Sequence, residues 1–333
     1  NESVMRKVLT CVGARPNFIK ITQLDKYFSA YPGIEHKLLH TRQHFDYEMT
    51  DIFFKELTIK QPDIFLDIKH GSQINIISEI MAGFKPIVKD YAPDLVLVPG
   101  DVHSSFACAF VASRCGFRVG HIESGLRSFD RTMPEEMNRI LIDDLADLLF
   151  VTEESGRQNL LNEQKPADKI HFSGNTMIDS LKVFLKKAEA SQVKKVLGID
   201  GEYLLLTLHR PNNVDSYRNM AHVAAIIEAA AEYAPLIFPI HPRTKKNFER
   251  FGLLEKLKAS PKVILTKPLG YLDFLNLLKD AKAVLTDSGG IQEETTYLGI
   301  PCLTLRENTE RPVTVDIGTV SYTHLTLPTR TRG

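Results

Sequence analysis

Charged residues crowd one short stretch of the sequence, HIESGLRSFDRTMPEEMNR, at residues 121–139. Asp101 lies just upstream, at the end of the apolar segment VLVPGD. Any one of these residues alone is typical of a solvated loop whose charges neutralise each other. As a group that follows an apolar strand, they indicate a site that transfers protons, because carboxyl groups with shifted pKa values can act as acid and as base. The carboxylates of the stretch are Glu123, Asp130, Glu135 and Glu136, and the arginines are Arg127, Arg131 and Arg139.

A glycine turn at residues 286–294, TDSGGIQEE, follows a predicted strand and opens a predicted helix. Ser288 can cap the helix, Gly289 and Gly290 let backbone N–H groups approach a ligand closely, and a helix N-terminus favours an anion. Glu294 could accept hydrogen bonds from sugar hydroxyls. The combination indicates the phosphate and ribose of a nucleotide. The alternative is a serine-capped turn whose glycines serve close packing.

A second glycine turn, GARPNFIK, occupies residues 13–20. Pro16 suits a first helical position, and Arg15 and Lys20 could neutralise a diphosphate. The turn is neither the dinucleotide-binding G-x-G-x-x-G nor a P-loop, which argues against a dinucleotide cofactor and against a kinase. A capped helix with a surface Arg and Lys is the alternative.

Two histidines follow predicted strands, His209 in TLHRPNN and His241 in FPIHPRT. A single histidine is usually structural, but with two at equivalent edges of one sheet, contact with phosphate or sugar is as well supported as a structural role. Asp101, in GDVHSS, could simply cap a helix. The Asp and His residues have no spacing typical of metal ligands, so we predict no metal.

These residues must be positioned by a regular alternation of elements. Short apolar runs alternate with amphipathic segments, which predicts parallel sheets covered on both faces by helices. In the first half, strands are predicted at 7–12, 37–41, 95–99, 118–122, 148–152 and 169–173, and helices at 17–30, 72–91, 104–115, 135–146 and 155–161. In the second half, strands are predicted at 203–208, 236–240, 262–266, 283–286 and 301–305, and helices at 220–233, 245–258, 272–280 and 291–298.

The alternation pauses at the lysine-rich segment 184–200, which reads as a linker helix or surface connection. The fold class predicted is therefore α/β, with two consecutive Rossmann-like, doubly wound domains. Ligands of such sheets bind at the carboxyl ends of the strands. Because nearly every predicted strand ends in a reactive or anion-binding residue, we expect one cleft between the two domains.

Composition excludes several classes of function. Of the 333 residues, 43% are hydrophobic and 25% charged, and Lys+Arg and Asp+Glu balance at 41 each. A chain without net charge is not expected to bind nucleic acid or an anionic membrane. The longest apolar runs are too short to span a membrane, and no signal peptide is visible at the N-terminus. Four cysteines without metal spacing favour a reducing compartment, so we expect a cytoplasmic protein.

Read together, the motifs resemble those of the non-hydrolysing UDP-N-acetylglucosamine 2-epimerases, in the order of that family. The resemblance covers residues 7–319 and implies the GT-B fold with a UDP-sugar in the interdomain cleft. The motifs that carry it are GARPNFIK, GDVHSS, GHIESGLRS, MPEEMNR, HFSGNTMID, TLHRPNN, TDSGGIQEE and RENTERPVT.

The resemblance also implies a mechanism. A base removes the C2 proton, UDP leaves from C1 to give a 2-acetamidoglucal, and UDP re-adds as the proton returns on the opposite face. The positions that match the family's catalytic residues are Asp101, Glu123, Glu135 and His209. Those that match its substrate and UDP contacts are Arg15, Lys20, Ser288, Gly289, Gly290, Glu294 and Arg311, with Arg139 and His241 as further cleft residues. On this reading, Asp130 and Glu136 belong to a solvated loop.

Two segments depart from the family pattern. The stretch 43–54, QHFDYEMTDIFF, differs from the form that builds a second, activating substrate site in common bacterial enzymes, and is more like relatives acting on UDP-2,3-diacetamido-glucuronates. The end, SYTHLTLPTRTRG, has no helical periodicity and no family likeness, and we interpret it as non-native.

The resulting hypothesis is a UDP-N-acetylglucosamine 2-epimerase, without cofactor and expected to be a homodimer, that supplies cell-surface polysaccharide precursors. We divide it into domains at 1–172 and 173–320, followed by the tail 321–333. The rivals are a 2-epimerase of a UDP-2,3-diacetamido-2,3-dideoxy-glucuronate, a GT-B glycosyltransferase and a nucleotide-sugar-binding relative without catalysis.

Overall fold

The computed structural model describes residues 5–42, 60–69, 71–306 and 309–322. The chain forms two compact units, Asn1–Leu181 and Lys182–Gly333, and the division falls inside helix α7 (Thr176–Ala188). The predicted domain boundary at 172/173 remains a prediction.

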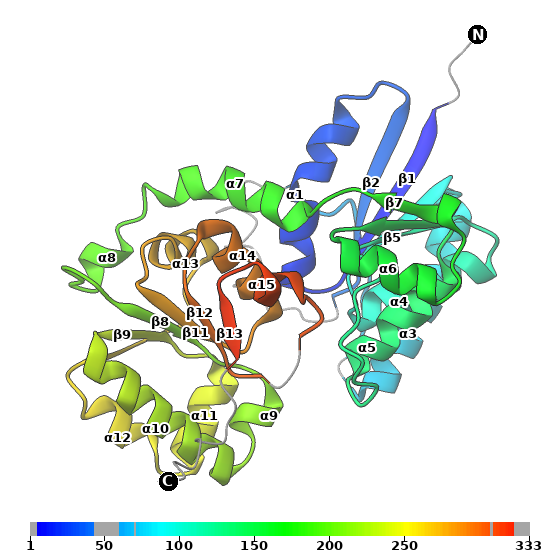
Figure 1. Ribbon diagram of the computed structural model, residues 1–333. Coiled ribbons are helices and arrows are strands. Elements are labelled where there is room, and N and C mark those ends of the chain that lie inside the picture. The colour runs from blue at the N-terminus through cyan, green and yellow to red at the C-terminus, as the bar shows by residue number, and fades with distance from the viewer. Residues whose placement is uncertain (1–4, 43–59, 70, 307–308, 323–333) are drawn as a thin grey trace. The chain divides into compact units, whose positions relative to one another are not determined.

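The first unit is built on a parallel sheet that has seven strands within the described residues, in the order β3-β2-β1-β4-β5-β6-β7 (Figure 1). The strands are β1 (Arg6–Val12), β2 (Ile34–His40), β3 (Ile64–Phe65), β4 (Leu95–Pro99), β5 (Val119–Ile122), β6 (Leu148–Val151) and β7 (Ile170–Phe172). The helices are α1 (Arg15–Ser29), α3 (Gln73–Tyr91), α4 (His103–Arg114), α5 (Pro134–Leu145) and α6 (Glu154–Asn162), with a 3-10 turn at Ala167–Lys169.

Helices cover both faces of this sheet, as its strand residues show. Neighbouring residues of a strand point to opposite faces. Leu9 accordingly packs in a core cluster with residues of α3, α4 and α5, whereas Val8 packs with Leu24 and Phe28 of α1. Strands buried on both faces explain why their sequences are continuously apolar.

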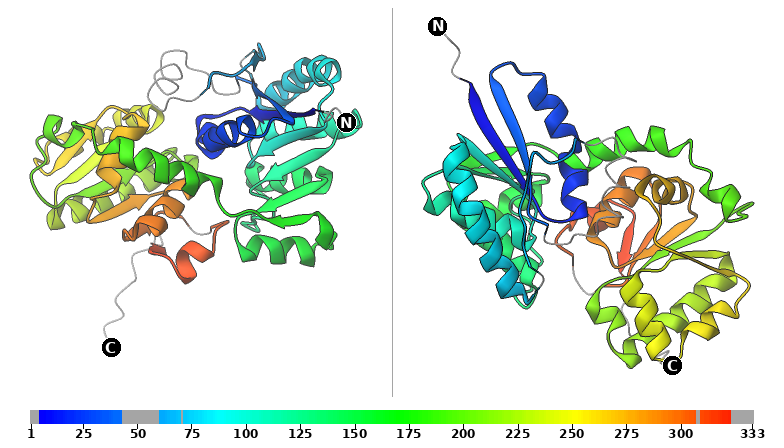
Figure 2. Two further views of the ribbon diagram at one scale, coloured as in Figure 1. Left: turned by 90° about the horizontal axis from the view of Figure 1, so that it is seen from above. Right: turned by 180° about the vertical axis from the view of Figure 1, so that it is seen from behind.

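The second unit has a parallel sheet with six strands in the part of the chain that the structure describes, in the order β10-β9-β8-β11-β12-β13. Figure 1 shows α10, α11 and α12 on one side of this sheet and α13 and α14 on the other, and Figure 2 gives two further views. The strands are β8 (Leu204–Thr207), β9 (Leu236–Pro239), β10 (Val263–Thr266), β11 (Ala283–Thr286), β12 (Cys302–Thr304) and β13 (Val320–Tyr322). The helices after α7 are α8 (Val193–Val196), α9 (Pro211–Val214), α10 (Tyr217–Tyr233), α11 (Pro242–Arg250), α12 (Leu254–Lys258), α13 (Tyr271–Leu278), α14 (Gly289–Leu298) and α15 (Val313–Asp316).

The predicted α/β class, with two Rossmann-like parallel sheets, is confirmed, and three details are corrected. The single helix expected at 245–258 is two helices, because Gly252 has a φ of +70° and ends α11. The short edge strands β3 and β13 were not predicted. Residues 321 and 322, which the sequence assigned to the tail, belong to β13 and pair with β12.

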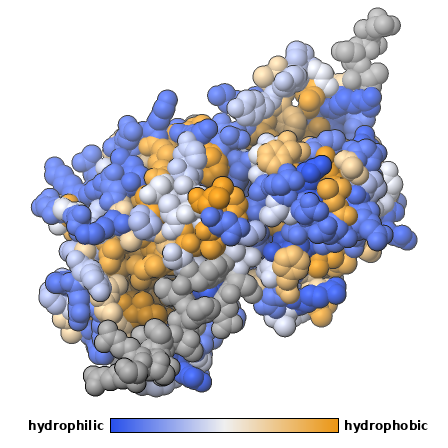
Figure 3. All heavy atoms as spheres, viewed as in Figure 1, coloured by the Kyte–Doolittle hydropathy of each residue, from blue (hydrophilic) through white to orange (hydrophobic). Residues whose placement is uncertain are grey.

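Hydrophilic and hydrophobic residues are interspersed on the face of the molecule shown in Figure 3. Within the described residues, no helix is long and apolar enough to cross a membrane.

Candidate active site

The strand order of the first unit reverses between β1 and β4, and the predicted residues gather at this switch point. Parallel sheets place ligands there, outside the carboxyl ends of the strands. Asp101 follows β4, and Glu123 follows the adjacent β5. Lys20 lies on α1, the helix that leaves β1. The topology therefore brings together residues that are far apart in the sequence.

Lys20 and Glu123 form a buried ion pair, with Lys20 Nζ 2.6 Å from Glu123 Oε2. The Lys20 side chain is 11% exposed and that of Glu123 is 3% exposed. A buried ion pair is retained only where both charges are well partnered. Lys20 was predicted to contact a diphosphate, and here its ammonium group is paired with the carboxylate predicted to be catalytic.

The backbone of Glu123 has a φ of +68°, which is uncommon for a residue other than glycine. Such conformations cluster at functional sites, where the surrounding structure holds them. Ser124 N donates to Phe150 O across to β6 and secures the turn. Glu123 therefore lies on a turn with a left-handed backbone conformation, which is unfavourable for a residue with a side chain.

Asp101 is paired with Arg139, whose Nη2 lies 2.6 Å from Asp101 Oδ2. Asp101 does not cap α4, since the N-cap position of that helix is Val102. Arg139 is buried and its Nη1 lies 2.5 Å from Glu136 Oε2. One arginine of α5 therefore holds a site carboxylate and a structural carboxylate together.

Glu136 is not part of a solvated loop, and that prediction was wrong. Its side chain is 1% exposed and accepts hydrogen bonds from the backbone N–H groups of Ser128 and Phe129. The loop between β5 and α5 folds back over this carboxylate, which satisfies amides that would otherwise be buried without partners. Asp130, in contrast, is half-buried and bonds to Thr132 within its own turn.

Glu135 is exposed on the first turn of α5. Burial lowers the pKa of the nearby His103, and the Glu135 carboxylate partly opposes this shift. Asn138, one turn further along α5, donates to Asp101 O at 2.8 Å and contacts the His103 ring at 3.2 Å. The helix face that carries Asn138 and Arg139 is therefore turned to the Asp101 segment.

The strand order of the second unit reverses between β8 and β11, where His209 and the SGG turn are found. His209 Nδ1 lies 2.9 Å from Asp287 Oδ1, and the same carboxylate accepts from His209 N and Arg210 N. Asn213 Nδ2 donates to it as well. Burial opposes ionisation of Asp287, but His209 and these donors outweigh it and hold the pKa below its usual range.

Asp287 is a residue that the sequence analysis missed. Its side chain is 0% exposed and orients the His209 ring, leaving Nε2 as the nitrogen outside this contact. The available signal was its position, directly before SGG at the end of a strand. His241, the other predicted histidine, is the exposed N-cap of α11, and its ring centroid lies 6.3 Å from that of His209.

The SGG turn begins α14 as predicted, with Ser288 at the N-cap position. The expected capping bond is wrong, because the Ser288 side chain makes no such bond to the described residues of the helix. A side-chain carbon at Gly289 would lie 2.5 Å from Glu310 Oε1, so a larger residue here would require the Glu310 side chain to move. Gly290 follows it in the first turn of α14, whose N–H groups suit an anion.

Two buried glutamates of α14 differ in their partners. Arg311 pairs with Glu293, and Tyr271 Oη donates to Glu294 Oε1 at 2.8 Å. Burial raises the pKa of Glu294 to about 7, although the Tyr271 hydrogen bond opposes this shift. Arg15, the remaining predicted contact, is the first residue of α1.

Known proteins resemble this chain in sequence and in fold. A family model described as UDP-N-acetylglucosamine 2-epimerase matches residues 26–326. The chain is 41% identical to the UDP-N-acetylglucosamine 2-epimerase of Methanococcus maripaludis over 320 residues, 94% of this chain and 86% of that protein. The chain belongs to the UDP-N-acetylglucosamine 2-epimerase family.

Two further members of this epimerase family are informative. The crystal structure of the Methanocaldococcus jannaschii UDP-GlcNAc 2-epimerase in complex with UDP-GlcNAc and UDP matches with a TM-score of 0.89 and 40% identity, covering 96% of this chain and 89% of that one. The UDP-2,3-diacetamido-2,3-dideoxy-D-glucuronate 2-epimerase of Pseudomonas aeruginosa is 39% identical, over 91% of this chain and 84% of that protein. The resemblance inferred from the motifs is confirmed, and the chain is an isomerase of this family.

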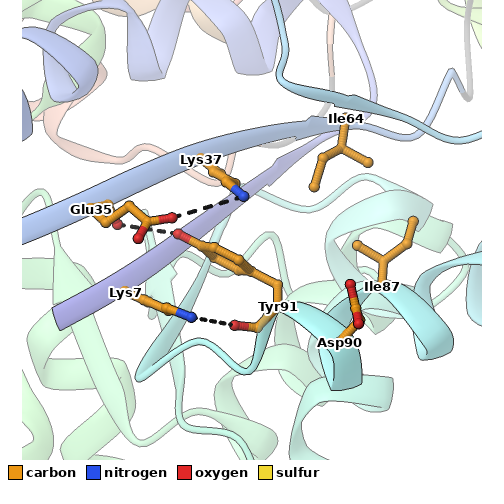
Figure 4. Close-up of a pocket in the computed structure, with 7 residues that line it drawn as sticks. All are labelled: Lys7, Glu35, Lys37, Ile64, Ile87, Asp90 and Tyr91. Carbon is orange, nitrogen blue, oxygen red and sulfur yellow. Dashed lines mark hydrogen bonds and ion pairs between the residues drawn. The ribbon is translucent and has the colours of Figure 1, made fainter. Parts of the chain in front are cut away.

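A pocket at the amino-terminal halves of β1 and β2 contains none of the predicted epimerase residues. Figure 4 shows Lys7 and Lys37 beside the ring of Tyr91, with the ammonium groups 5.3 Å and 4.4 Å from the ring centroid. Lys7 Nζ donates to Tyr91 O, and Lys37 pairs with Glu35. Both ammonium groups therefore have partners among the residues that line the pocket. The candidate active site therefore rests on the switch points.

The stretch 43–54 lies outside the described residues. What its sequence implies about a second, activating substrate site therefore stays a prediction. Among the described residues, no three His, Cys, Asp or Glu side chains are grouped so that they could hold a metal ion.

The raised pKa of Glu294 predicts a pH-dependent stability. An unfolded glutamate ionises near pH 4.5, whereas folded Glu294 keeps its proton to about pH 7. The unfolded state therefore binds fewer protons between these values, so folding stability falls as the pH rises through this window. The Glu294→Gln variant lacks this titrating group. Its free energy of unfolding, relative to that of the parent, should therefore rise by about 2 kcal/mol when the pH is raised from about 5 to about 8.

Thermal melts of both proteins at the two pH values check this, with the gain seen as a shift of about 5 °C. Glu255→Gln is the matched control, because the Glu255 side chain is 81% exposed and should show no pH-dependent difference. The prediction would be contradicted if the difference in melting temperature between Glu294→Gln and the parent were the same at both pH values.

Proposed function

We propose that this chain interconverts UDP-N-acetylglucosamine and UDP-N-acetylmannosamine by inversion at sugar C2. The observation that carries the proposal is the placement of two carboxylates, Asp101 and Glu123, at the ends of adjacent strands beside the switch point. Each has a cationic partner, Arg139 and Lys20 respectively, which favours the ionised form that can accept a proton. Inversion at C2 needs an acid/base group on each face of the sugar.

The proposed reaction is an anti elimination followed by re-addition. One carboxylate takes the C2 proton, the electron pair of that C–H bond forms the C1–C2 double bond, and the C1–O bond breaks with release of UDP. Re-addition of UDP to the 2-acetamidoglucal and return of a proton to the opposite face of C2 complete the inversion. Asp101, Glu123 and Glu135 are the proposed proton-transfer groups.

UDP is assigned to residues of both units. His209, held by Asp287, is proposed to steady the departing diphosphate, together with Arg15, Lys20 and the N-terminus of α14. Arg139, His241 and Arg311 complete the proposed contacts. Glu294 is proposed to bind the ribose.

The setting of this activity is also proposed from the sequence. The product would supply cell-surface polysaccharide, and the enzyme would be a homodimer. A cytoplasmic location fits the four cysteines, all of which lie in the described part of the chain and are free thiols.

The nearest alternative substrate is a UDP-2,3-diacetamido-2,3-dideoxy-glucuronate. The 39% identical relative from Pseudomonas aeruginosa bears that activity in its name, and the sequence of residues 43–54 favours it. A glycosyltransferase reading is weaker, since it rests on the shared fold alone.

Incubation with each UDP-sugar in D2O, followed by NMR at C2, tests the proposal. UDP-N-acetylglucosamine should take up deuterium at C2 and give the manno product. Exchange with the diacetamido-glucuronate only would select the alternative. Loss of the sugar only when an acceptor is added would indicate a glycosyltransferase, and exchange with neither substrate would refute an epimerase acting on them.

A further inference from the structure

His121, on the strand that leads to Glu123, contacts two hydrogen-bond acceptors. It lies on β5, two residues before Glu123, and its side chain is 0% exposed. Nδ1 lies 2.6 Å from Asp143 Oδ1 on α5, and Nε2 lies 3.0 Å from Gly100 O at the end of β4. No role for His121 follows from the proton-transfer scheme above.

These two partners decide the protonation state of the ring. A backbone carbonyl can only accept, so Nε2 carries a proton. Burial opposes ionisation of Asp143, but contacts with His121 and Arg127 outweigh it and hold the pKa of that carboxyl below its usual range. Asp143 is therefore an acceptor as well, and Nδ1 also donates. The ring is an imidazolium ion.

The charges around the ring balance. Arg127 Nη1 lies 2.7 Å from Asp143 Oδ2, and its Nη2 lies 2.6 Å from Glu163 Oε2. Two cations, His121 and Arg127, thus face two carboxylates, Asp143 and Glu163. A buried network in which every charge is paired can be rigid, whereas one with an unpaired member is costly.

The network of His121, Asp143 and Arg127 contacts the backbone next to both site carboxylates, Asp101 and Glu123. Gly100, whose carbonyl His121 binds, directly precedes Asp101 and has a φ of +63°. A side-chain carbon at Gly100 would lie 3.0 Å from Lys20 Nζ, so the ion pair of Lys20 and Glu123 rests directly on this residue. Gly125 N, just past Glu123, donates to Asp143 Oδ2 at 3.1 Å.

We propose that His121 is a positioning residue for the epimerase reaction. As an imidazolium ion it ties the end of β4 to α5, and so fixes Asp101 and Glu123 relative to each other. This role rests on the proposed function, but the doubly protonated ring does not.

A second buried histidine in the same unit provides a matched contrast. His36 Nδ1 lies 2.9 Å from Asp25 Oδ1, but its Nε2 faces the hydroxyl of Thr10 at 2.9 Å. A hydroxyl can donate or accept, so a neutral ring satisfies both contacts. Burial lowers the pKa of His36, although Asp25 opposes this. His36 lies on β2, outside the candidate active site.

The protonation state is tested by NMR on the full chain labelled with 15N-histidine, with His121 assigned from its absence in His121→Gln. Both ring nitrogens of His121 should be protonated in spectra of the folded protein at neutral pH, whereas the ring of His36 should show the neutral pattern. A neutral His121 ring would overturn the proposal, whether or not the protein is an epimerase.

The positioning role is tested by kinetics on the substrate that shows C2 exchange. His121→Gln should lower kcat about 100-fold, because misplacement of catalytic groups by about 1 Å has an effect of this size. KM should stay within about threefold, and His36→Gln should keep kcat within about twofold. Equal kcat values for the two variants would refute the role of His121. If His121→Gln fails to fold, His121→Asn takes its place in the kinetics, and the His121 ring signals of the parent chain are assigned by sequential backbone assignment.

Discussion

Glu123→Gln should lower the rate of C2 deuterium exchange by about 10³-fold or more, since general acid–base groups contribute about 10²–10⁴-fold. Glutamine has nearly the shape of glutamate but cannot take up the C2 proton. It can still accept a hydrogen bond from Lys20, whose Nζ lies 2.6 Å from Glu123 Oε2. UDP binding should change little, because the SGG turn and Glu294 lie in the other unit.

Exchange rates by NMR and UDP affinity by calorimetry are the two measurements. Asp130→Asn serves as the matched control, because the half-buried Asp130 side chain accepts hydrogen bonds from Thr132, is not among the proposed proton-transfer groups and should retain the parent rate. A Glu123→Gln protein that exchanges deuterium at the parent rate would remove Glu123 from the mechanism.

Gly125→Ala should lower the free energy of unfolding by about 3 kcal/mol more than Gly116→Ala does. Both glycines have left-handed backbones, with φ of +79° at Gly125 and +83° at Gly116, so alanine carries a similar conformational cost at either site. A side-chain carbon at Gly125, however, would lie 2.2 Å from the carbonyl oxygen of Gly156, which is backbone and cannot rotate away. At Gly116 no atom lies within 4 Å among the described residues.

Urea denaturation of the two variants measures the difference. Because Gly125 lies two residues after Glu123, a folded Gly125→Ala protein should also lose C2 exchange, whereas Gly116→Ala should keep it. Equal stability of the two variants would show that the turn after β5 can move away from α6.

Much of the fold could be predicted from the sequence, because its causes are local or periodic. Continuous apolar strands such as LVLVP require helices on both faces, which defines the α/β class. The break within 245–258 was missed, since a glycine inside a helical pattern does not reveal its φ. The pair of edge strands was missed because β3 is two residues long and β13 three.

The candidate site, like the fold, could be predicted from the sequence only in part. The residue types, their places after strands and the glycine turns predict Asp101, Glu123 and His209 as site residues. The partners of these residues were not visible, because an ion pair depends on strand order and on contacts between residues far apart in the chain. Lys20 meets Glu123 across 103 positions, and Asp287 meets His209 across 78.

The sequence by itself determined the two parallel sheets, the chemical groups at their carboxyl ends and the family. Only the tertiary structure decided how each group is held: Glu136 is buried beneath a loop, Asp287 orients His209, and the His121 ring lies between Asp143 and Gly100. The physical reason is that pattern and propensity act along the chain, whereas burial, pairing and protonation depend on neighbours that only folding supplies.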